Sequence, residues 1–138
     1  MSPGYPALAP GVRAALLQAL DDSGRSEICG FLFGQPVGRG DGQGFRRLRN
    51  YGGGGEFRID QSELDSVLRD LERHGAPVLA FVHSHRSGLG LSSADRAALR
   101  GSRWPWLVVM RHPAGLAGQW YAPGPGAGPG QGMPLHTG

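Results

Sequence analysis

The sequence has no lysine, so all 14 of its basic residues are arginines. They are spread from Arg13 to Arg111, and no run is longer than the pair Arg46 and Arg47. Proteins that bind nucleic acid usually gather basic residues on one face or along one helix. The net charge of +3 is therefore attributed to a composition rich in arginine, glycine, proline and alanine, and no nucleic-acid partner is expected.

Cysteine and long hydrophobic runs are also scarce. With Cys29 alone, neither a disulfide nor a four-cysteine zinc site can form within the chain. No apolar run approaches the roughly 20 residues that cross a membrane. The opening MSPGYPALAP lacks the basic start and apolar stretch of a signal peptide. We expect a cytoplasmic protein without membrane contact, in a compartment that keeps a lone thiol reduced.

Glycine and proline, in contrast, are abundant, with 25 and 11 copies. Many lie beyond Tyr121, where APGPGAGPGQGMPLHTG offers too little apolar surface to fold by itself. A chain of 138 residues is otherwise long enough to bury one hydrophobic core. The sequence thus predicts a single domain over residues 1–122 and a flexible Gly/Pro-rich tail over residues 123–138.

Segments with helical and strand periodicity follow one another within that domain. In DQSELDSVLRDLERH, for example, the leucines and the valine share one helical stripe, and Asp60 is a helix-start signal. The glycine-rich segment 50–56 is expected to be a loop. The predicted helices span 10–21, 60–74 and 92–100, and the predicted strands span 27–34, 45–49, 78–82, 106–111 and 116–121. This order favours an α/β domain with a mixed sheet and helices packed against it.

The strongest chemical pattern begins where the strand VLAFV runs into HSH. On a strand, residues two apart point to the same face, so His83 and His85 converge. Asp95 lies in the first turn of the third predicted helix if Ser92 is its cap, and the glycine-containing loop between them permits a chain reversal. Two imidazoles and one carboxylate are a common catalytic zinc set that leaves one position for water. Structural histidines, a first-turn acid and an ordinary N-cap serine explain the same residues one by one.

Glu27 is a further candidate because it comes directly before an apolar strand. A carboxylate beside a zinc-bound water can take its proton and pass it to a leaving amine. An edge acid that faces solvent is the alternative interpretation. No local spacing places Glu27 near the histidines.

Taken together, three motifs resemble the signature of the JAMM (MPN-plus) metalloprotease family: Glu27 within SEICGFLFG, the HSH at 83–85, and Ser92-x-x-Asp95. The segments FRIDQSEL at 57–64 and WPWLVV at 104–109 are similar to further parts of that family. The resemblance implies one MPN/JAMM domain of cytidine-deaminase-like fold, with a mixed curved β-sheet and flanking helices.

The resemblance also implies a role for each matched residue. His83, His85 and Asp95 would hold one Zn²⁺ per chain. Glu27 would act as general base and then as general acid through the bound water, and Ser92 would help stabilise the oxyanion.

Two features depart from the family pattern. Arg86 stands where the family commonly has proline, and the segment between His85 and Ser92 is one residue shorter than usual. Ser84, between the two histidines, should point to the opposite face of its strand and bond within the domain.

Compact prokaryotic members of this family cleave after the C-terminal Gly-Gly of ubiquitin-like or sulfur-carrier proteins, and the resemblance implies the same substrate class here. The substrate tail would lie along an edge strand near residues 51–59. Two alternatives stay open: release of an amino acid such as cysteine from the C-terminus of a sulfur carrier, and a non-catalytic scaffold of MPN type. Monomer and homodimer are both compatible with the sequence.

Overall fold

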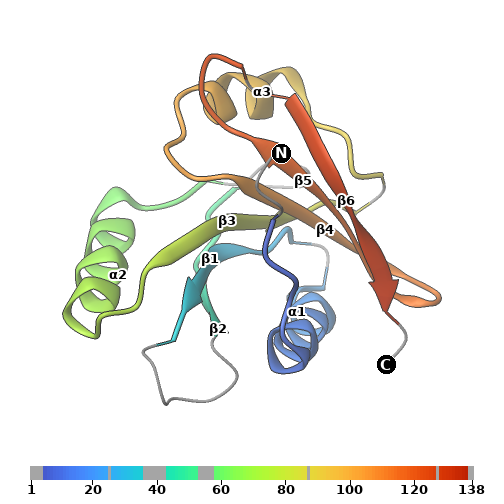
Figure 1. Cartoon of the computed structure of the whole chain (residues 1–138), viewed down its shortest axis with the longest axis horizontal. Coiled ribbons are helices and arrows are strands. Elements are labelled where there is room, and N and C mark those ends of the chain that lie inside the picture. Colours follow the sequence, from blue (N-terminus) through green and yellow to red (C-terminus); the bar gives the residue numbers. More distant parts are fainter. Residues whose placement is uncertain are drawn as a thin grey trace.

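The computed structural model describes residues 5–24, 26–35, 43–52, 58–86, 88–126 and 128–136, with the backbone alone at residues 131 and 133–136. Residues 53–56 of the predicted glycine loop therefore lie outside the described part of the chain. The described elements, in chain order, are α1 (Pro10–Ser23), β1 (Cys29–Gly34), β2 (Gln43–Leu48), α2 (Gln61–Arg73), β3 (Val78–Ser84), α3 (Ser93–Arg100), β4 (Trp106–His112), β5 (Gly115–Ala122) and β6 (Gly128–His136) (Figure 1).

The strands form one mixed, twisted sheet in the order β2-β1-β3-β4-β5-β6 (Figure 1). Only β3 and β4 pair in parallel; the other neighbouring pairs are antiparallel. The chain between β3 and β4 contains α3, as a parallel crossover requires. The predicted α/β class with a mixed sheet and flanking helices is confirmed.

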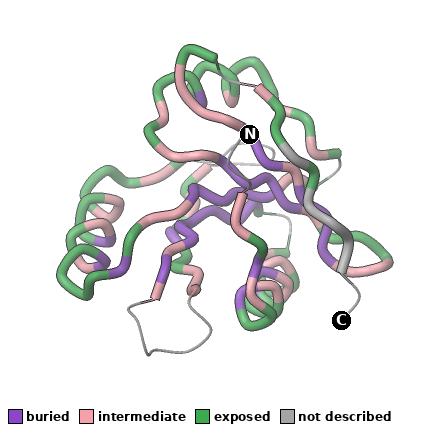
Figure 2. The backbone as a smooth tube through the Cα atoms, viewed as in Figure 1, coloured by how far each residue is buried: buried purple, intermediate pink, exposed green. Residues whose placement is uncertain are grey.

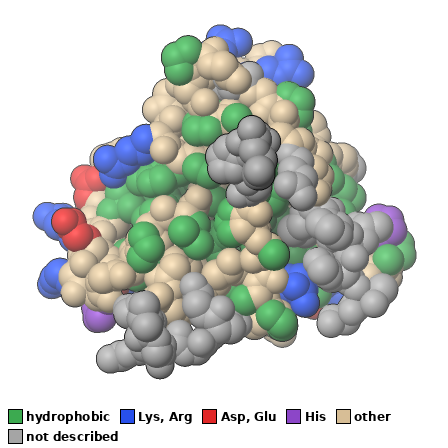
Figure 3. All heavy atoms as spheres, in the orientation of Figure 1, with side chains coloured by type: hydrophobic (Ala, Val, Ile, Leu, Met, Phe, Trp, Pro, Cys, Tyr) green, Lys and Arg blue, Asp and Glu red, His purple; other side chains and the backbone are tan. Residues whose placement is uncertain are grey.

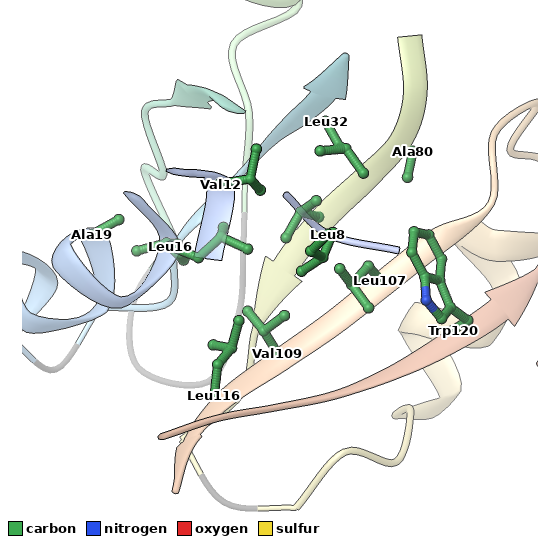
Figure 4. Packing of buried hydrophobic residues seen from close by; sticks show 12 residues of the cluster. Leu8, Val12, Leu16, Ala19, Leu32, Ala80, Leu107, Val109, Leu116 and Trp120 are labelled. Atoms are coloured by element: carbon green, nitrogen blue, oxygen red, sulfur yellow. The ribbon is translucent and has the colours of Figure 1, made fainter. Parts of the chain in front are cut away.

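One face of this sheet is covered by α1. Val12 and Leu16 of the helix belong to one buried cluster with strand residues that include Leu32, Val109 and Trp120 (Figure 4). These strand residues alternate with residues of the opposite face, because successive side chains of a strand point to opposite sides. The central strands β1, β3 and β4 are accordingly buried along most of their length (Figure 2).

The other face carries α2 and α3. Val67 of α2 and Leu99 of α3 belong to a second buried cluster with Phe31, Phe81 and Val108 of the sheet. His83 lies on this same face, because it is two residues after Phe81 on β3. The second face is therefore the one that can carry the predicted site.

The predicted flexible tail is wrong for residues Gly128–His136, which form β6 and pair antiparallel with β5. The segment offers too little apolar surface to fold alone, but β6 adds to an existing sheet edge, where backbone hydrogen bonds need no core of their own. Glycine also has a local use here. A Cβ at Gly130 would collide with the ring of Tyr5, which stacks on Trp120 with ring centroids 4.9 Å apart.

Among the described residues, none of the helices is long and apolar enough to cross a membrane. On the face shown in Figure 3, the described arginines lie scattered around the periphery and form no continuous basic patch.

The β1–β2 pair supports the site strand and depends on Gly30. A Cβ at this position would lie 2.9 Å from the Cα of Arg47 and collide with the carbonyl oxygen of Arg46. We predict that Gly30→Ala lowers the free energy of unfolding by roughly 1–3 kcal/mol, the usual cost of overpacking, measured by urea denaturation. Gly101→Ala is the matched control, because its Cβ would meet only the carbonyl oxygen of Ala98 at 3.8 Å. Equal effects of the two substitutions would contradict the steric argument.

Candidate metal centre

The end of β3 places two imidazoles on the face that carries α2 and α3. The ring of His83 is fully buried and packs edge-on against Trp106, with ring centroids 5.0 Å apart and an interplanar angle of 85°. The ring of His85 lies 5.0 Å from that of His83. The backbone N–H of His85 donates to the carbonyl of Val109 at 3.0 Å, so β4 holds the strand end in place. Ring packing thus positions His83, and strand pairing positions the backbone of His85 beside it.

Asp95 comes to the same place from the first turn of α3. Ser92 is the N-cap: its hydroxyl oxygen accepts from the backbone N–H of Asp95 at 3.1 Å, and Asp95 Oδ2 accepts from the backbone N–H of Ser92 at 3.2 Å. This capping box fixes the carboxylate. The same Oδ2 lies 3.3 Å from Nε2 of His85. The helix cap thus aims the carboxylate at the imidazole.

The geometry of these groups fits a metal ion. Ligand atoms of His83, His85 and Asp95 all lie within 4.8 Å of one another. In a tetrahedral site with bonds near 2.1 Å, ligand atoms are about 3.4 Å apart, close to the 3.3 Å between His85 and Asp95. Two imidazole nitrogens and one carboxylate oxygen form a donor set typical of zinc and similar transition metals. The three residues could hold a metal ion with small adjustments.

The protonation state of His83 is the one that metal binding requires. Burial lowers the pKa of His83 to about 4; the charge of Asp95 raises the pKa, and that of His85 lowers it further. The imidazole is therefore neutral near pH 7, and the neutral form is the one that binds metals.

The pairing of β1 with β3 brings Glu27 to the same site. Cys29 is the partner of His83 in this antiparallel pair. Ser84 continues the pairing beyond it: its backbone N–H donates to the carbonyl of Ile28 at 2.9 Å, and its side-chain oxygen accepts from the backbone N–H of Ile28 at 2.8 Å. The next residue, Glu27, therefore lies opposite His85, on the face of the metal ligands. Ser84 itself points to the other face and bonds within the domain, as predicted.

Glu27 is buried, with only 6% of its surface exposed. Burial raises the pKa of its carboxyl group; His85 lowers it and Asp95 raises it. Two of the metal-ligand candidates thus lie within electrostatic reach of Glu27. A buried carboxyl with a raised pKa beside a metal site can serve as a base and as an acid.

Sequence reasoning missed two residues that support this arrangement. Asn50 donates from Nδ2 to the carbonyl of Glu27 at 2.9 Å and accepts at Oδ1 from the backbone of Gly52 and Arg58 at 2.8 Å. Tyr121 donates its hydroxyl to the carbonyl of Leu89 at 2.6 Å, which holds the shortened loop before α3. The position of Asn50, two residues before the glycine run, was a signal for its role. Tyr121 was predicted only as a strand residue.

The structure places Ser92 at the cap of α3, exposed to solvent. A serine hydroxyl has one proton to donate and two lone pairs to accept with. The cap uses one lone pair, so the hydroxyl proton stays available for a ligand. Capping the helix and binding a substrate oxygen are therefore compatible for this residue.

Comparisons with known proteins agree with the fold. The family model for prokaryotic homologs of the JAB domain matches residues 9–121. A solution structure of a protein from Desulfitobacterium hafniense has a TM-score of 0.74 at 19% identity and covers 96% of this chain and 93% of that one. A second, from Salinibacter ruber, has a TM-score of 0.58 at 16% identity, with coverages of 96% and 92%. No curated protein matches the sequence.

The bond between Ile28 and Ser84 can be tested by itself. Ser84→Ala leaves the buried N–H of Ile28 without this acceptor, so the free energy of unfolding should fall by roughly 1–3 kcal/mol, measured by denaturant unfolding. Ser66→Ala, on the exposed side of α2, is the control and should stay within about 0.5 kcal/mol of the unmodified protein. If Ser84→Ala behaved like the control, the bond would not hold the two strands together.

Cys29 is buried on the face that carries the site, beside His83 in the sheet register. Burial, the largest influence, raises the pKa of its thiol to about 12, and repulsion from Glu63 adds to this. At pH 8 the native thiol should therefore react with iodoacetamide on the order of a thousandfold more slowly than the thiol in urea-unfolded protein, since only the thiolate reacts. Similar rates in both states would show that the thiol is accessible and not a core residue.

Proposed function

Because the chain belongs to the prokaryotic JAB-domain homologues, we propose that it is a zinc-dependent peptidase or isopeptidase. The observation that carries the proposal is the meeting of Glu27 with His83, His85 and Asp95. Three of these residues have the donor atoms and spacing of a metal site, and the fourth is a buried carboxyl opposite His85. A structural metal site needs no such additional acid.

Zinc is the metal proposed, at one ion per chain. Two neutral imidazoles and one carboxylate form the ligand set of many catalytic zinc sites, in which the fourth position stays open. When bound, zinc lowers the pKa of a coordinated water to about 7 and polarises a substrate carbonyl.

The chain's own residues would supply the proton transfers and part of the charge stabilisation. The Glu27 carboxylate takes the proton from the attacking water and then delivers it to the nitrogen of the leaving group, so one group acts as base and then as acid. The free hydroxyl proton of Ser92 donates to the carbonyl oxygen as negative charge develops there. A donor of this kind contributes on the order of 3 kcal/mol to lowering the barrier.

The proposed substrate is the C-terminal Gly-Gly segment of a ubiquitin-like or sulfur-carrier protein. β2 is an edge strand of the sheet, so an extended peptide can pair with it by strand addition. A groove of about 480 Å³ lies at the end of β2, with Leu48 and Arg49 on one side and Glu27 on another. The end of the edge strand and the proposed base thus line the same groove. Glycines before the cleaved bond would let the substrate backbone approach the buried site closely.

Three variants of the full chain test this proposal. Purified protein should contain about one zinc per chain by elemental analysis and should cleave a ubiquitin-like protein that carries a short extension after its Gly-Gly. Glu27→Gln should keep the zinc and lower kcat by about 10²- to 10⁴-fold, because it removes the proton carrier. Ser92→Ala should lower kcat by about 10²-fold with zinc retained. His83→Ala should lose both zinc and activity.

A fusion with Ala-Ala in place of Gly-Gly is the substrate control and should be cleaved poorly. Protein without zinc, or activity unchanged in His83→Ala, would overturn the metallopeptidase proposal. Stoichiometric zinc without cleavage of any Gly-Gly fusion would favour the non-catalytic scaffold instead.

A further inference from the structure

A second cavity lies beyond α3, on the side of the helix that faces β5 and β6. It has a volume of about 380 Å³ and is lined by Leu91, Arg96, Leu99, Arg100, Tyr121 and Pro129, among others. Leu91 ends the loop that joins the two histidines to α3, and Pro129 comes from β6. This volume is at the low end for small-molecule pockets, so it suits a small ligand or a short peptide end.

The charged residues that line this pocket are both arginines. Arg96 and Arg100 are four residues apart on α3 and thus neighbours on one face, an arrangement of like charges that destabilises a helix slightly. Among the described residues, no carboxylate lies within ion-pair distance of either guanidinium, and none lines the pocket. Two guanidinium groups with no acid between them form a site for an anion, and guanidinium binds carboxylates with two parallel hydrogen bonds.

The pocket adjoins the candidate metal centre. Arg96 directly follows Asp95 on α3. Besides burial, which raises the pKa of Tyr121, both charges act on that pKa: Arg96 lowers it and Asp95 raises it. Tyr121 also fixes Leu89, in the loop that joins the histidines to α3. In the sheet, β1 lies on one side of β3, and Glu27 directly precedes the pairing of these two strands. β5 and β6 lie on the other side of β3. The metal centre therefore separates the groove at β2 from the arginine pocket.

We propose that the arginine pocket binds the free C-terminal carboxylate of the fragment that leaves on cleavage. This inference rests on the proposed peptidase function and deepens it. With the Gly-Gly side of the substrate along β2, the leaving side extends across the metal centre toward α3. A short C-terminal extension places its carboxylate there, against Arg96 and Arg100, with its side chain against Leu91, Leu99 and Pro129. The enzyme then removes short C-terminal extensions in preference to large conjugated proteins, whose leaving lysine carries no carboxylate.

The lining favours a carboxylate over a phosphate. Leu91, Leu99 and Pro129 give the pocket an apolar wall that suits an aliphatic side chain next to the charged group. A folded protein partner needs roughly 800 Å² of surface on each side, far more than this pocket offers.

Matched peptides test the pocket. A peptide that ends in Gly-Gly-Leu-Leu is compared with the same peptide as its C-terminal amide, using the zinc-loaded full chain. The amide should raise KM on the order of tenfold or more with little change in kcat, because it loses the charged hydrogen bonds to guanidinium. Arg100→Gln should raise KM for the acid peptide and abolish the preference, and Arg100→Lys should restore part of it. Arg69→Gln, an exposed arginine on α2, is the charge-matched control and should keep the full preference.

Binding is measured separately, by calorimetric titration of the full chain with the dipeptide Leu-Leu, its amide and inorganic phosphate. Tighter binding of the acid without cleavage of any peptide would support the pocket and reject the peptidase proposal. Equal cleavage of acid and amide, with equal binding, would reject the pocket and leave the peptidase proposal intact. Tighter binding of phosphate than of the acid dipeptide, or equal loss in Arg100→Gln and Arg69→Gln, would also overturn the inference.

Discussion

The antiparallel register of β1 and β3 is the constraint on which the candidate site depends. Ile28 and Ser84 exchange two hydrogen bonds, one through the backbone and one through the serine hydroxyl. This pairing fixes which residue of the first strand lies opposite His85, and that residue is Glu27. A slip of one residue would turn the carboxyl to the opposite face of the sheet, because side chains alternate along a strand. The serine between the two histidines thus acts on the face opposite to theirs, where it aligns the proposed base with the proposed ligands.

A helix cap performs a comparable task for the third ligand candidate. The capping box of α3 satisfies the first backbone donors of the helix and at the same time orients the carboxylate of Asp95. One oxygen, Oδ2, accepts from the Ser92 backbone and faces His85. The hydrogen bond from Tyr121 to Leu89 holds the loop that leads into this cap. The shortened loop after Arg86 is therefore long enough to bring the carboxylate back to the strand end.

The two edges of the sheet differ in a way that bears on function. β2 is the edge strand on the side of Glu27, and a groove lies at its end. β6 ends it on the side of α3, where a chain rich in glycine and proline forms part of a wall of the arginine pocket. The family match stops at residue 121, so this wall comes from a segment outside the matched region. A residue of β6 thus contributes to the proposed leaving-group side.

Local pattern by itself determined the order of the three helices and the first five strands, the convergence of His83 and His85, and the cap at Ser92. These depend on the periodicity of side chains and on contacts within a few residues. Tertiary structure alone decided three things: that Glu27 lies opposite His85, that residues Gly128–His136 join the sheet, and that Arg96 and Arg100 line a pocket to which no described acid contributes. The physical reason is the same in each case. Strand register, edge pairing and cavity walls are set by contacts between residues far apart in the chain, and no local spacing records them.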